Sequence, residues 1–368
     1  LFEGLTAYDA QGNLVPAVAE SWQIEDNKTW IFTLRENAKW SNGEAVTASD
    51  FMQSWQALSQ SESPLKNYLA FMNLKNAKAV LEKTLIVESL GLFVENDRTL
   101  RIELDKASPY LPSMLAHVSL FPRYTKSTET FISNGAYQLQ SQTENQHILT
   151  ANPYYWAKEK VIFQQVQYQK IEADRDLSDF DIAINPQKTV QNIQDYPQLC
   201  TYFYEFNLAD PMLQKSAVRK AIASMISTKN LVADIAHLYP SNTFLPKSML
   251  GEQESVWEPV VAEQLLSQNQ ITETHPLKLR IRYDDSSLNQ TIATRLNRQL
   301  SQSDLLRVEN QGMSWQELQT ARTKGDFQLI RSGWCADFND PIAFLNLFYS
   351  KSPDNKNGYK NAEFDRLF

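Results

Sequence analysis

The stretch from residue 277 to residue 330 changes its apolar period twice, and this change constrains the fold more than any other feature of the chain. Apolar residues occupy every second position over 277–283, which predicts a strand with one buried face. They recur at every fourth position over 288–300, which predicts an amphipathic helix. Another strand is predicted at 327–330. Strand, helix and strand in this order predict a βαβ element and therefore an α/β fold.

The first half of the chain carries weaker signals of both periods. Alternation over 29–35 and over 100–104 predicts two strands, and Ser108-Pro109 then breaks the pattern before a short helix. Thr47 and Asp50 have the spacing of a capping box, so a helix is predicted to begin there.

The residue composition and the apolar pattern change again toward the middle of the chain. From residue 134 onward the sequence is rich in Gln, Thr and aromatic residues and is predicted to be mostly β, with a strand at 180–184. After Cys200, apolar residues share one helical face over 218–226, and Thr228 is predicted to cap a further helix through Ile235. A new α/β unit is predicted to begin here.

Length and composition limit the possible functions. At 368 residues with 42% hydrophobic side chains, the chain is long enough for two or three domains with proper cores. A net charge of -8 argues against a nucleic-acid partner, because such proteins concentrate Lys and Arg. No run approaches the roughly 20 apolar residues of a membrane span.

Motifs for catalysis, metals and cofactors are missing from the sequence. The four histidines are scattered, and the two cysteines lack Cys-x-x-Cys spacing. No glycine-rich phosphate loop or Gly-x-Ser-x-Gly elbow occurs. The adjacent acids Asp284 and Asp285 precede two serines and are interpreted as a loop or helix cap. We therefore expect no enzyme activity, no metal and no cofactor.

One constellation, at residues 331–341, suggests a binding site. It follows a predicted strand and combines a cation, an indole, a thiol and an anion. Gly333 would let a ligand backbone approach closely, Trp334 would offer an apolar wall, and Asp337 would neutralise a buried ammonium group. Those are the needs of a free peptide amino terminus. The alternative, in which Trp334 is a core residue and Asp337 caps a turn, stays open.

Six blocks of sequence occur in an order that is specific to one family. They are LFEGL at 1–5, VAESW at 18–22, FTLRENAKWSNG at 32–43, NGAY at 134–137, CTY at 200–202 and GWCAD at 333–337. On these blocks the chain resembles the dipeptide and oligopeptide branch of the family 5 extracellular solute-binding proteins. It is most similar to the periplasmic oligopeptide-binding members, which serve bacterial ABC importers.

The resemblance implies a bilobed periplasmic-binding-protein fold of the α/β class, type II and cluster C, with an extra third domain. Residues 1–128 would be mainly the additional domain, 129–199 part of the first ligand-binding lobe and 200–368 the second lobe. The chain would be a fragment that lacks the family's first strand and its C-terminal hinge return. A periplasmic location is expected, with a signal peptide or a lipid anchor upstream.

The resemblance also implies roles for individual residues. Cys200 and Cys335 would form a disulfide bond, and Asp337 would bind the α-amino group of a peptide. Gly333 and Cys335 would pair their backbone with that peptide. Four further side chains match positions that line pockets or meet peptide carboxylates: Trp315, Arg322, Arg331 and Trp334.

Several positions depart from the family's pattern. Three apolar residues stand where the family has tyrosines near the ligand: Leu65, Ile184 and Phe203. Asn185 beside Ile184 is retained, whereas Ala236 and Asn289 replace a lysine and a histidine that help to place peptide carboxyl termini. These changes imply a less polar pocket that accepts longer or more hydrophobic ligands.

Peptide capture for an inner-membrane ABC importer, by a monomer, is the leading hypothesis. The alternative is a specialised relative that binds murein peptide, haem or a lipid-like ligand. A peptidase is a third hypothesis, against which the missing nucleophile and metal motifs argue. A fourth is a role in signalling or adhesion, which the sequence does not separate from transport.

Overall fold

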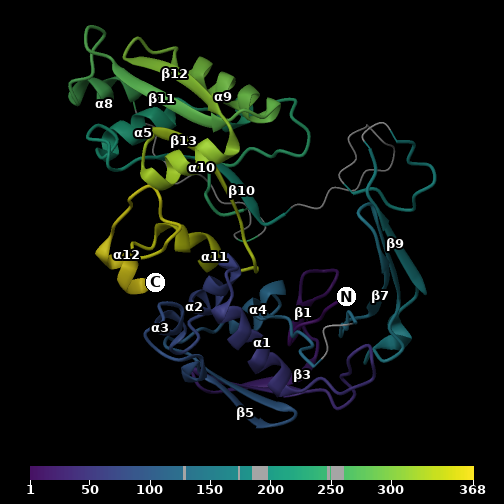
Figure 1. Cartoon of the computed structure of the whole chain (residues 1–368). Helices are drawn as coiled ribbons and strands as arrows, with labels where there is room; N and C mark the ends of the chain where they lie inside the picture. Colours follow the sequence, from purple (N-terminus) through teal and green to yellow (C-terminus); the bar gives the residue numbers. More distant parts are fainter. Residues whose placement is uncertain (127–129, 173–174, 185–197, 247–248, 250–260) are drawn as a thin grey trace. The chain divides into compact units, whose positions relative to one another are not determined.

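A computed structural model describes residues 1–126, 130–172, 175–184, 198–246, 249 and 261–368 of the chain (Figure 1). The chain divides into two compact units, Leu1–Ile193 and Gln194–Phe368. Each unit combines helices with sheets, which confirms the predicted α/β class. The finer division at residue 128 stays a prediction.

The described part of the first unit forms three antiparallel sheets, with strand orders β1-β2, β3-β4-β6-β5 and β7-β8-β9. The strands are β1 (Thr6–Tyr8), β2 (Leu14–Pro16), β3 (Ala19–Asp26), β4 (Thr29–Leu34), β5 (Leu92–Asn96), β6 (Thr99–Glu103), β7 (Tyr137–Gln142), β8 (Gln146–Ala151) and β9 (Gln165–Gln169). The helices are α1 (Ala48–Gln60), η1 (Pro64–Lys66), α2 (Asn67–Phe71), α3 (Ala77–Leu81), η2 (Val87–Ser89), α4 (Leu111–Met114), η3 (Val118–Leu120) and η4 (Lys158–Lys160).

Helix α1 anchors the core of the first unit. It begins after Thr47, whose capping box with Asp50 confirms the predicted start. The helix contacts β5 and β6, and it buries Phe51 and Trp55 completely. The indole N–H of Trp55 donates to the carbonyl of Leu120 at 2.8 Å, so this large side chain is buried with its polar atom satisfied.

The predicted strands at 29–35 and 100–104 are confirmed as β4 and β6, and the short helix after Ser108-Pro109 is α4. The strand predicted at 180–184 is wrong, because this segment pairs with no described strand. Its isoleucines, Ile182 and Ile184, are 81% and 77% exposed. Apolar alternation favours a strand only where a neighbouring strand and a core receive it.

The described part of the second unit contains one four-stranded sheet in the order β10-β13-β11-β12. Its strands are β10 (Cys200–Phe206), β11 (Leu277–Asp284), β12 (Leu306–Met313) and β13 (Leu329–Cys335). β11 runs parallel to β12 and β13, whereas β10 is antiparallel to β13. The helices are α5 (Ser216–Ser224), α6 (Thr228–Leu231), α8 (Ala262–Gln268), α9 (Ser287–Leu300), α10 (Trp315–Lys324), α11 (Ile342–Leu345), η5 (Asn346–Phe348) and α12 (Ala362–Leu367).

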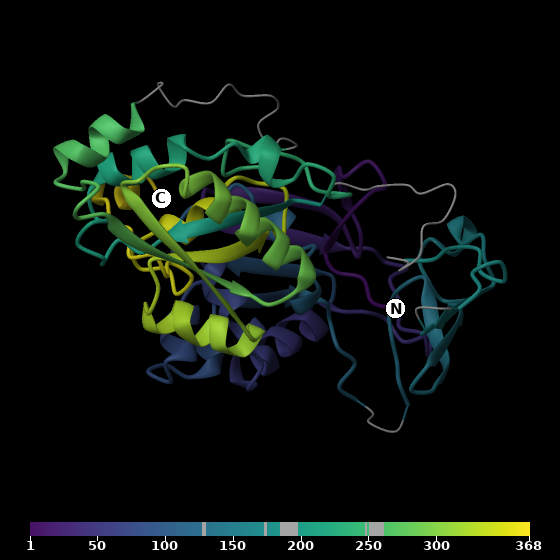
Figure 2. The same ribbon diagram turned by 90° about the horizontal axis from the view of Figure 1, so that it is seen from above.

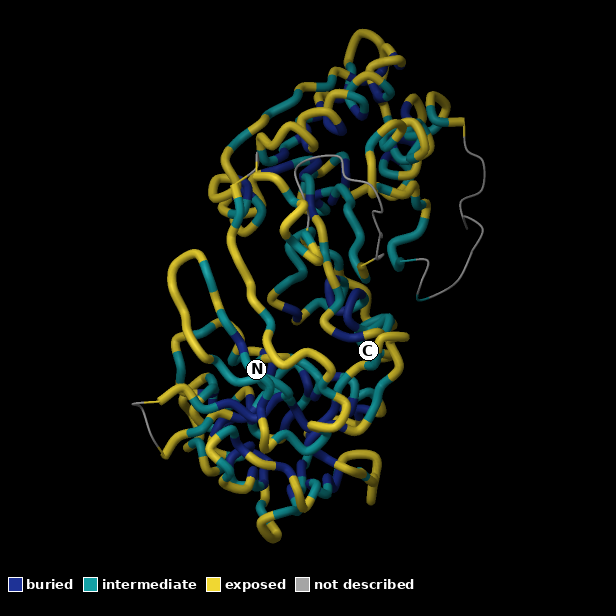
Figure 3. The backbone as a smooth tube through the Cα atoms, turned by 90° about the vertical axis from the view of Figure 1, so that its right-hand side faces the viewer, coloured by how far each residue is buried: buried dark blue, intermediate teal, exposed yellow. Residues whose placement is uncertain are grey.

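Helices cover both faces of this sheet. The buried side chains of α5, α8 and α9 form one core with Leu329 of β13 and the buried face of β11. Leu318 of α10 packs in another core with Ile330. Because Leu329 and Ile330 are adjacent in a strand, the two cores lie on opposite faces. α9 runs beside β11 and β12 (Figure 2). Within each unit, buried stretches of the chain gather in the interior and exposed stretches lie at the surface (Figure 3).

The predicted strand at 277–283 and helix at 288–300 are confirmed as β11 and α9. The strand that completes the βαβ element is β12, which was not predicted, and α10 then leads to β13. The predicted cap at Thr228 is wrong by one residue. Ser227 caps α6 by accepting from the backbone N–H of Asn230, and the helix ends before Ile235.

Candidate functional site

The parallel strands of the second unit end at one edge of the sheet. Asp284 closes β11 and aligns with Met313, which closes β12. Helices α9 and α10 begin at the same edge, where Ser286 and Ser314 accept hydrogen bonds from the first turns. Ligands of α/β proteins bind at such carboxyl edges, because side chains and helix N-termini converge there.

A disulfide bond fixes β10 to the end of β13. Cys200 and Cys335 lie opposite each other in the antiparallel register and are bonded, which confirms the predicted pair. The bond spans a sequence separation of 135. By the chain-entropy estimate, a cross-link of that span stabilises the fold by about 4 to 5 kcal/mol.

The last part of β13 has one open edge. β11 pairs only with Leu329 and Ile330, so residues 331–335 have no strand partner on that side within the described part of the chain. Gly333 lies in this open stretch and is exposed. A Cβ atom built on Gly333 would come no closer than 3.6 Å to another atom, the carbonyl oxygen of Thr201. The fold itself therefore leaves room for a side chain at this position.

Trp334 and Asp337 differ in how far they are exposed. The indole N–H of Trp334 donates to the carbonyl of Ala343 at 2.7 Å, which ties the half-buried side chain to α11. Asp337 follows the disulfide by two residues and is exposed. The alternative of a core tryptophan thus describes part of Trp334, and Asp337 is an exposed residue whose role stays a prediction.

Arg331 lies at the centre of a polar and aromatic cluster. Its guanidinium carbon is 4.8 Å from the ring centroid of Tyr202 and 5.9 Å from that of Trp315. One terminal nitrogen is 3.3 Å from a carboxylate oxygen of Asp284. The predicted residues Arg331 and Trp315 are therefore brought together. Asp284, the ion-pair partner of Arg331, was not predicted to be part of the site.

Asn289 holds Asp284 in this cluster. The amide nitrogen of Asn289 donates to Asp284 at 2.7 Å, and its oxygen accepts from the hydroxyl of Tyr202 at 3.0 Å. The interpretation of Asp284 as part of a loop or cap is wrong, because it closes a strand and forms an ion pair while Ser286 caps α9. The sequence did contain a signal for this position, because Asp284 ends a predicted strand just before a predicted helix.

Two tyrosines of β10 supply hydroxyl donors to the same edge. Burial raises the pKa of Tyr202 and of Tyr204 above the usual value for tyrosine. Both hydroxyls therefore stay protonated at neutral pH and can donate hydrogen bonds. Neither residue was predicted, because their role depends on the strand register that sets β10 beside β13.

Arg322, also predicted, already has a charge partner within the chain. Its Nε donates to a carboxylate oxygen of Glu205 at 2.7 Å. The side chains of Arg322 and Glu205 are only 14% and 5% exposed, so this is a largely buried ion pair. It joins α10 to β10 beneath the candidate site.

Phe203 points to the opposite face of β10 from Tyr202 and Tyr204, because it lies between them in the strand. Phe203 packs edge-on against Phe244 with ring centroids 5.0 Å apart, and Phe244 continues to Phe344 and Phe348. Leu65 belongs to the first unit, where it is 46% exposed. Asn185 lies outside the described residues.

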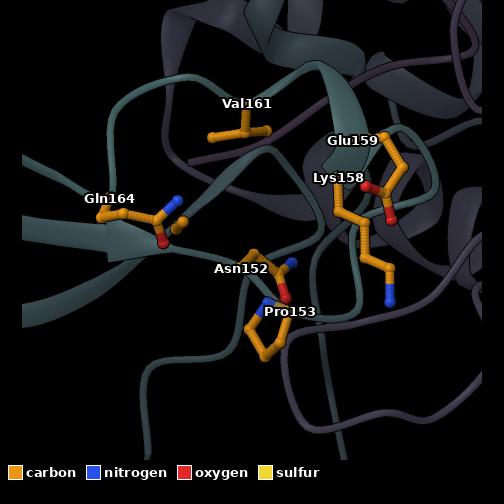
Figure 4. A pocket seen from close by; sticks show the side chains of 7 residues that line it. Asn152, Pro153, Lys158, Glu159, Val161 and Gln164 are labelled. Atoms are coloured by element: carbon orange, nitrogen blue, oxygen red, sulfur yellow. The ribbon is translucent and has the colours of Figure 1, made fainter.

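A hollow of about 230 Å³ in the first unit contains none of the predicted residues (Figure 4). Its lining residues are Ala151, Asn152, Pro153, Lys158, Glu159, Val161 and Gln164. Within the described part of the chain, no group of three or more His, Cys, Asp or Glu side chains is placed to hold a metal ion. No helix there is long and apolar enough to cross a bilayer.

Curated proteins are similar to this chain over its whole length, and two of them illustrate the range of identity. A Haemophilus influenzae protein described as a putative binding protein is 89% identical over 368 residues, which are 100% of this chain and 72% of that protein. The periplasmic oligopeptide-binding protein OppA of Salmonella typhimurium is 31% identical over 407 residues, with 100% of this chain and 75% of OppA covered.

Solved structures show the same similarity. The unliganded open form of the murein tripeptide-binding protein MppA matches with a TM-score of 0.83 and 30% identity, over 100% of this chain and 79% of that chain. OppA of Haemophilus influenzae in complex with the peptide RPPGFSPFR matches with a TM-score of 0.74 and 26% identity, over 100% and 80% of the two chains. These neighbours are bilobed periplasmic peptide-binding proteins. Residues 13–356 match the family described as bacterial extracellular solute-binding proteins, family 5 Middle, and the chain belongs to this family.

Proposed function

We propose that the protein is the periplasmic substrate-binding component of an ABC importer and that it captures oligopeptides. Membership of the extracellular solute-binding family and the similarity to OppA support this role. The Cys200–Cys335 disulfide agrees with an oxidising compartment such as the periplasm. The partner would be an inner-membrane permease, and the receptor would work as a monomer that carries out no chemistry on its ligand.

The observation that carries the peptide assignment is the open edge of β13 at residues 331–335. An extended peptide can add to such an edge as an extra strand, which provides main-chain hydrogen bonds regardless of the peptide's sequence. The disulfide at Cys335 holds this edge in place, so little ordering is needed when a peptide pairs with it. Gly333 adds room for close approach, because among the described residues only the Thr201 carbonyl oxygen, at 3.6 Å, would meet a Cβ atom at this position.

Asp337 provides the contact that would fix the peptide's direction. It is exposed just beyond the open edge, where the ammonium group of a peptide paired with Gly333 and Cys335 would end. A carboxylate and an ammonium group form a charge-assisted hydrogen bond, which is about twice as strong as a neutral one. Binding would therefore depend on a free amino terminus more than on the side chains.

Calorimetric titration of the ligand-stripped protein, made from its complete gene, tests this proposal with tetra-alanine and N-acetyl tetra-alanine. We expect Asp337→Asn to weaken binding of the free-amino peptide by roughly 10- to 100-fold, as for a lost charged hydrogen bond. The acetylated peptide should bind weakly to both proteins.

Asp304→Asn is the matched control, because Asp304 is an exposed acid that precedes β12, at the opposite end of the sheet from Asp337. It should leave both affinities unchanged. Equal binding of the two peptides by the wild-type protein would contradict the role of Asp337.

A murein peptide is a second candidate ligand, since the match to MppA has a TM-score of 0.83. Murein peptides carry additional carboxylates on their side chains, which distinguishes them from tetra-alanine. Titration with a murein tripeptide beside tetra-alanine separates the two candidates, because a murein-specific receptor would bind only the former.

A further inference from the structure

We propose that Asp284 determines specificity by acting as an internal carboxylate for Arg331, so that this edge of the sheet favours an uncharged amide over a ligand carboxylate. The inference rests on the proposed function, because it concerns the far end of the peptide whose amino terminus meets Asp337. A ligand carboxylate would have to displace Asp284 in order to pair with Arg331.

The charge of Arg331 is already balanced within the chain. Its nearest carboxylate oxygen, on Asp284, is 3.3 Å away, and the side chains of Arg331 and Asp284 are 20% and 16% exposed. At such low exposure the ion pair is weakly screened by solvent and salt. A ligand carboxylate entering here would gain little from Arg331 and would be repelled by Asp284.

Asp284 is also held in place. Tyr202 donates to Asn289, and Asn289 donates to Asp284, so the carboxylate is the last acceptor in a short chain of hydrogen bonds. Asn289 is only 4% exposed, which fixes its amide in the core of the sheet edge. Asp284 would break a charged hydrogen bond if it swung away to make room for a ligand anion.

The cluster keeps hydrogen-bonding capacity of both kinds. Among the described residues, Nε of Arg331 and Oδ1 of Asp284 are buried without a hydrogen bond, although Oδ1 is the oxygen that lies 3.3 Å from the Arg331 guanidinium in the ion pair. Nε is a donor and Oδ1 is an acceptor. An amide group offers an N–H to the acceptor and a C=O to a donor, whereas a carboxylate offers acceptors only.

The Arg322–Glu205 pair, in the same unit, is an ion pair whose hydrogen-bonding groups are satisfied within the chain. There the guanidinium donates directly to the carboxylate at 2.7 Å, and neither side chain keeps a buried unpaired atom. The Arg331 cluster differs in its longer ion-pair distance and in its buried atoms that lack a hydrogen bond, Nε of Arg331 and Oδ1 of Asp284. It also adjoins Trp315, which is 55% exposed and leaves ring surface for a ligand to cover.

The test titrates alanine peptides of two to five residues, each as the free acid and as the C-terminal amide, into the ligand-stripped protein made from its complete gene. At the length that places its end at Arg331, the wild-type protein should bind the amide about tenfold more tightly than the acid. Asp284→Asn keeps the shape and removes the charge. It should raise affinity for the acid about tenfold and change affinity for the amide less than about threefold.

Asp326→Asn is the matched control. Asp326 forms an ion pair with Arg282, which lies on β11 like Asp284, and the Asp326 side chain is 63% exposed. It should leave the acid-to-amide ratio at the wild-type value. A wild-type protein that binds the acid as tightly as the amide at every length overturns the inference, even if Asp284→Asn fails to fold. An unchanged ratio in a folded Asp284→Asn protein overturns it too. Failure to bind any of the peptides instead contradicts the proposed function.

Discussion

Gly333 is a residue that the fold does not require to be glycine. Its φ angle is not positive, and among the residues that the structure describes a Cβ atom would meet only the Thr201 carbonyl, at 3.6 Å. Gly325, which ends α10, is the opposite case, since its φ of 69° is one that residues with a side chain rarely adopt. The fold therefore requires glycine at position 325, whereas the proposed ligand requires it at position 333.

This contrast predicts opposite effects of substitution. Gly333→Val should change the free energy of unfolding by less than about 1 kcal/mol and weaken peptide binding about tenfold or more, because the new side chain occupies the space of the paired peptide. Gly325→Ala should cost about 1 kcal/mol of stability and leave binding unchanged. Urea unfolding and calorimetric titration measure the two quantities. Unaltered peptide affinity in Gly333→Val would show that no ligand uses the open edge.

At the residue scale, one role predicted from the resemblance is confirmed, the pairing of Cys200 with Cys335 across 135 positions. The binding roles of the motif at 333–337 stay predictions. Asp284 was undervalued because its partner Arg331 lies 47 positions away, and only the strand order β13-β11 brings the two together. The same holds for Tyr202, which reaches Asn289 across the edge of the sheet.

The ion pair between Arg322 and Glu205 ties α10 to β10 and so contributes to stability at the scale of elements. Removing one partner of a buried pair leaves the other charge without compensation. Arg322→Met should therefore lower the free energy of unfolding by about 3 kcal/mol. Arg366→Met is the control, because Arg366 and its partner Glu363 are both 66% exposed. That change should cost less than about 1 kcal/mol.

Equilibrium unfolding in urea of the three proteins measures these values. Similar losses in both variants would mean that the Arg322 pair is as well solvated as the exposed one.

Elements with one clearly buried face were predicted well, and edge elements were not. β11 buries every second residue and α9 buries one face, so both patterns were visible in the sequence. β12 lies at the edge of its sheet and buries only Leu306, so its alternation is diluted by polar residues. The prediction for 180–184 was wrong for the opposite reason, because this segment has the apolar alternation of a strand but pairs with no described strand.

At the scale of the whole molecule, the order of the six sequence blocks was enough to predict the family. The match over residues 13–356 and the MppA structure at 30% identity confirm that prediction. The departures Leu65, Ile184 and Phe203 remain predictions about ligand preference, since the structure places them in different surroundings. The identity of the cargo is therefore the central question.

Native mass spectrometry of the protein made from its complete gene, as purified, tests the central claim most directly. Denaturing release of the bound species then identifies the cargo. We expect short peptides of mixed sequence, because main-chain pairing at β13 and a contact to the amino terminus do not read side chains. A single defined compound that is not a peptide would contradict the account.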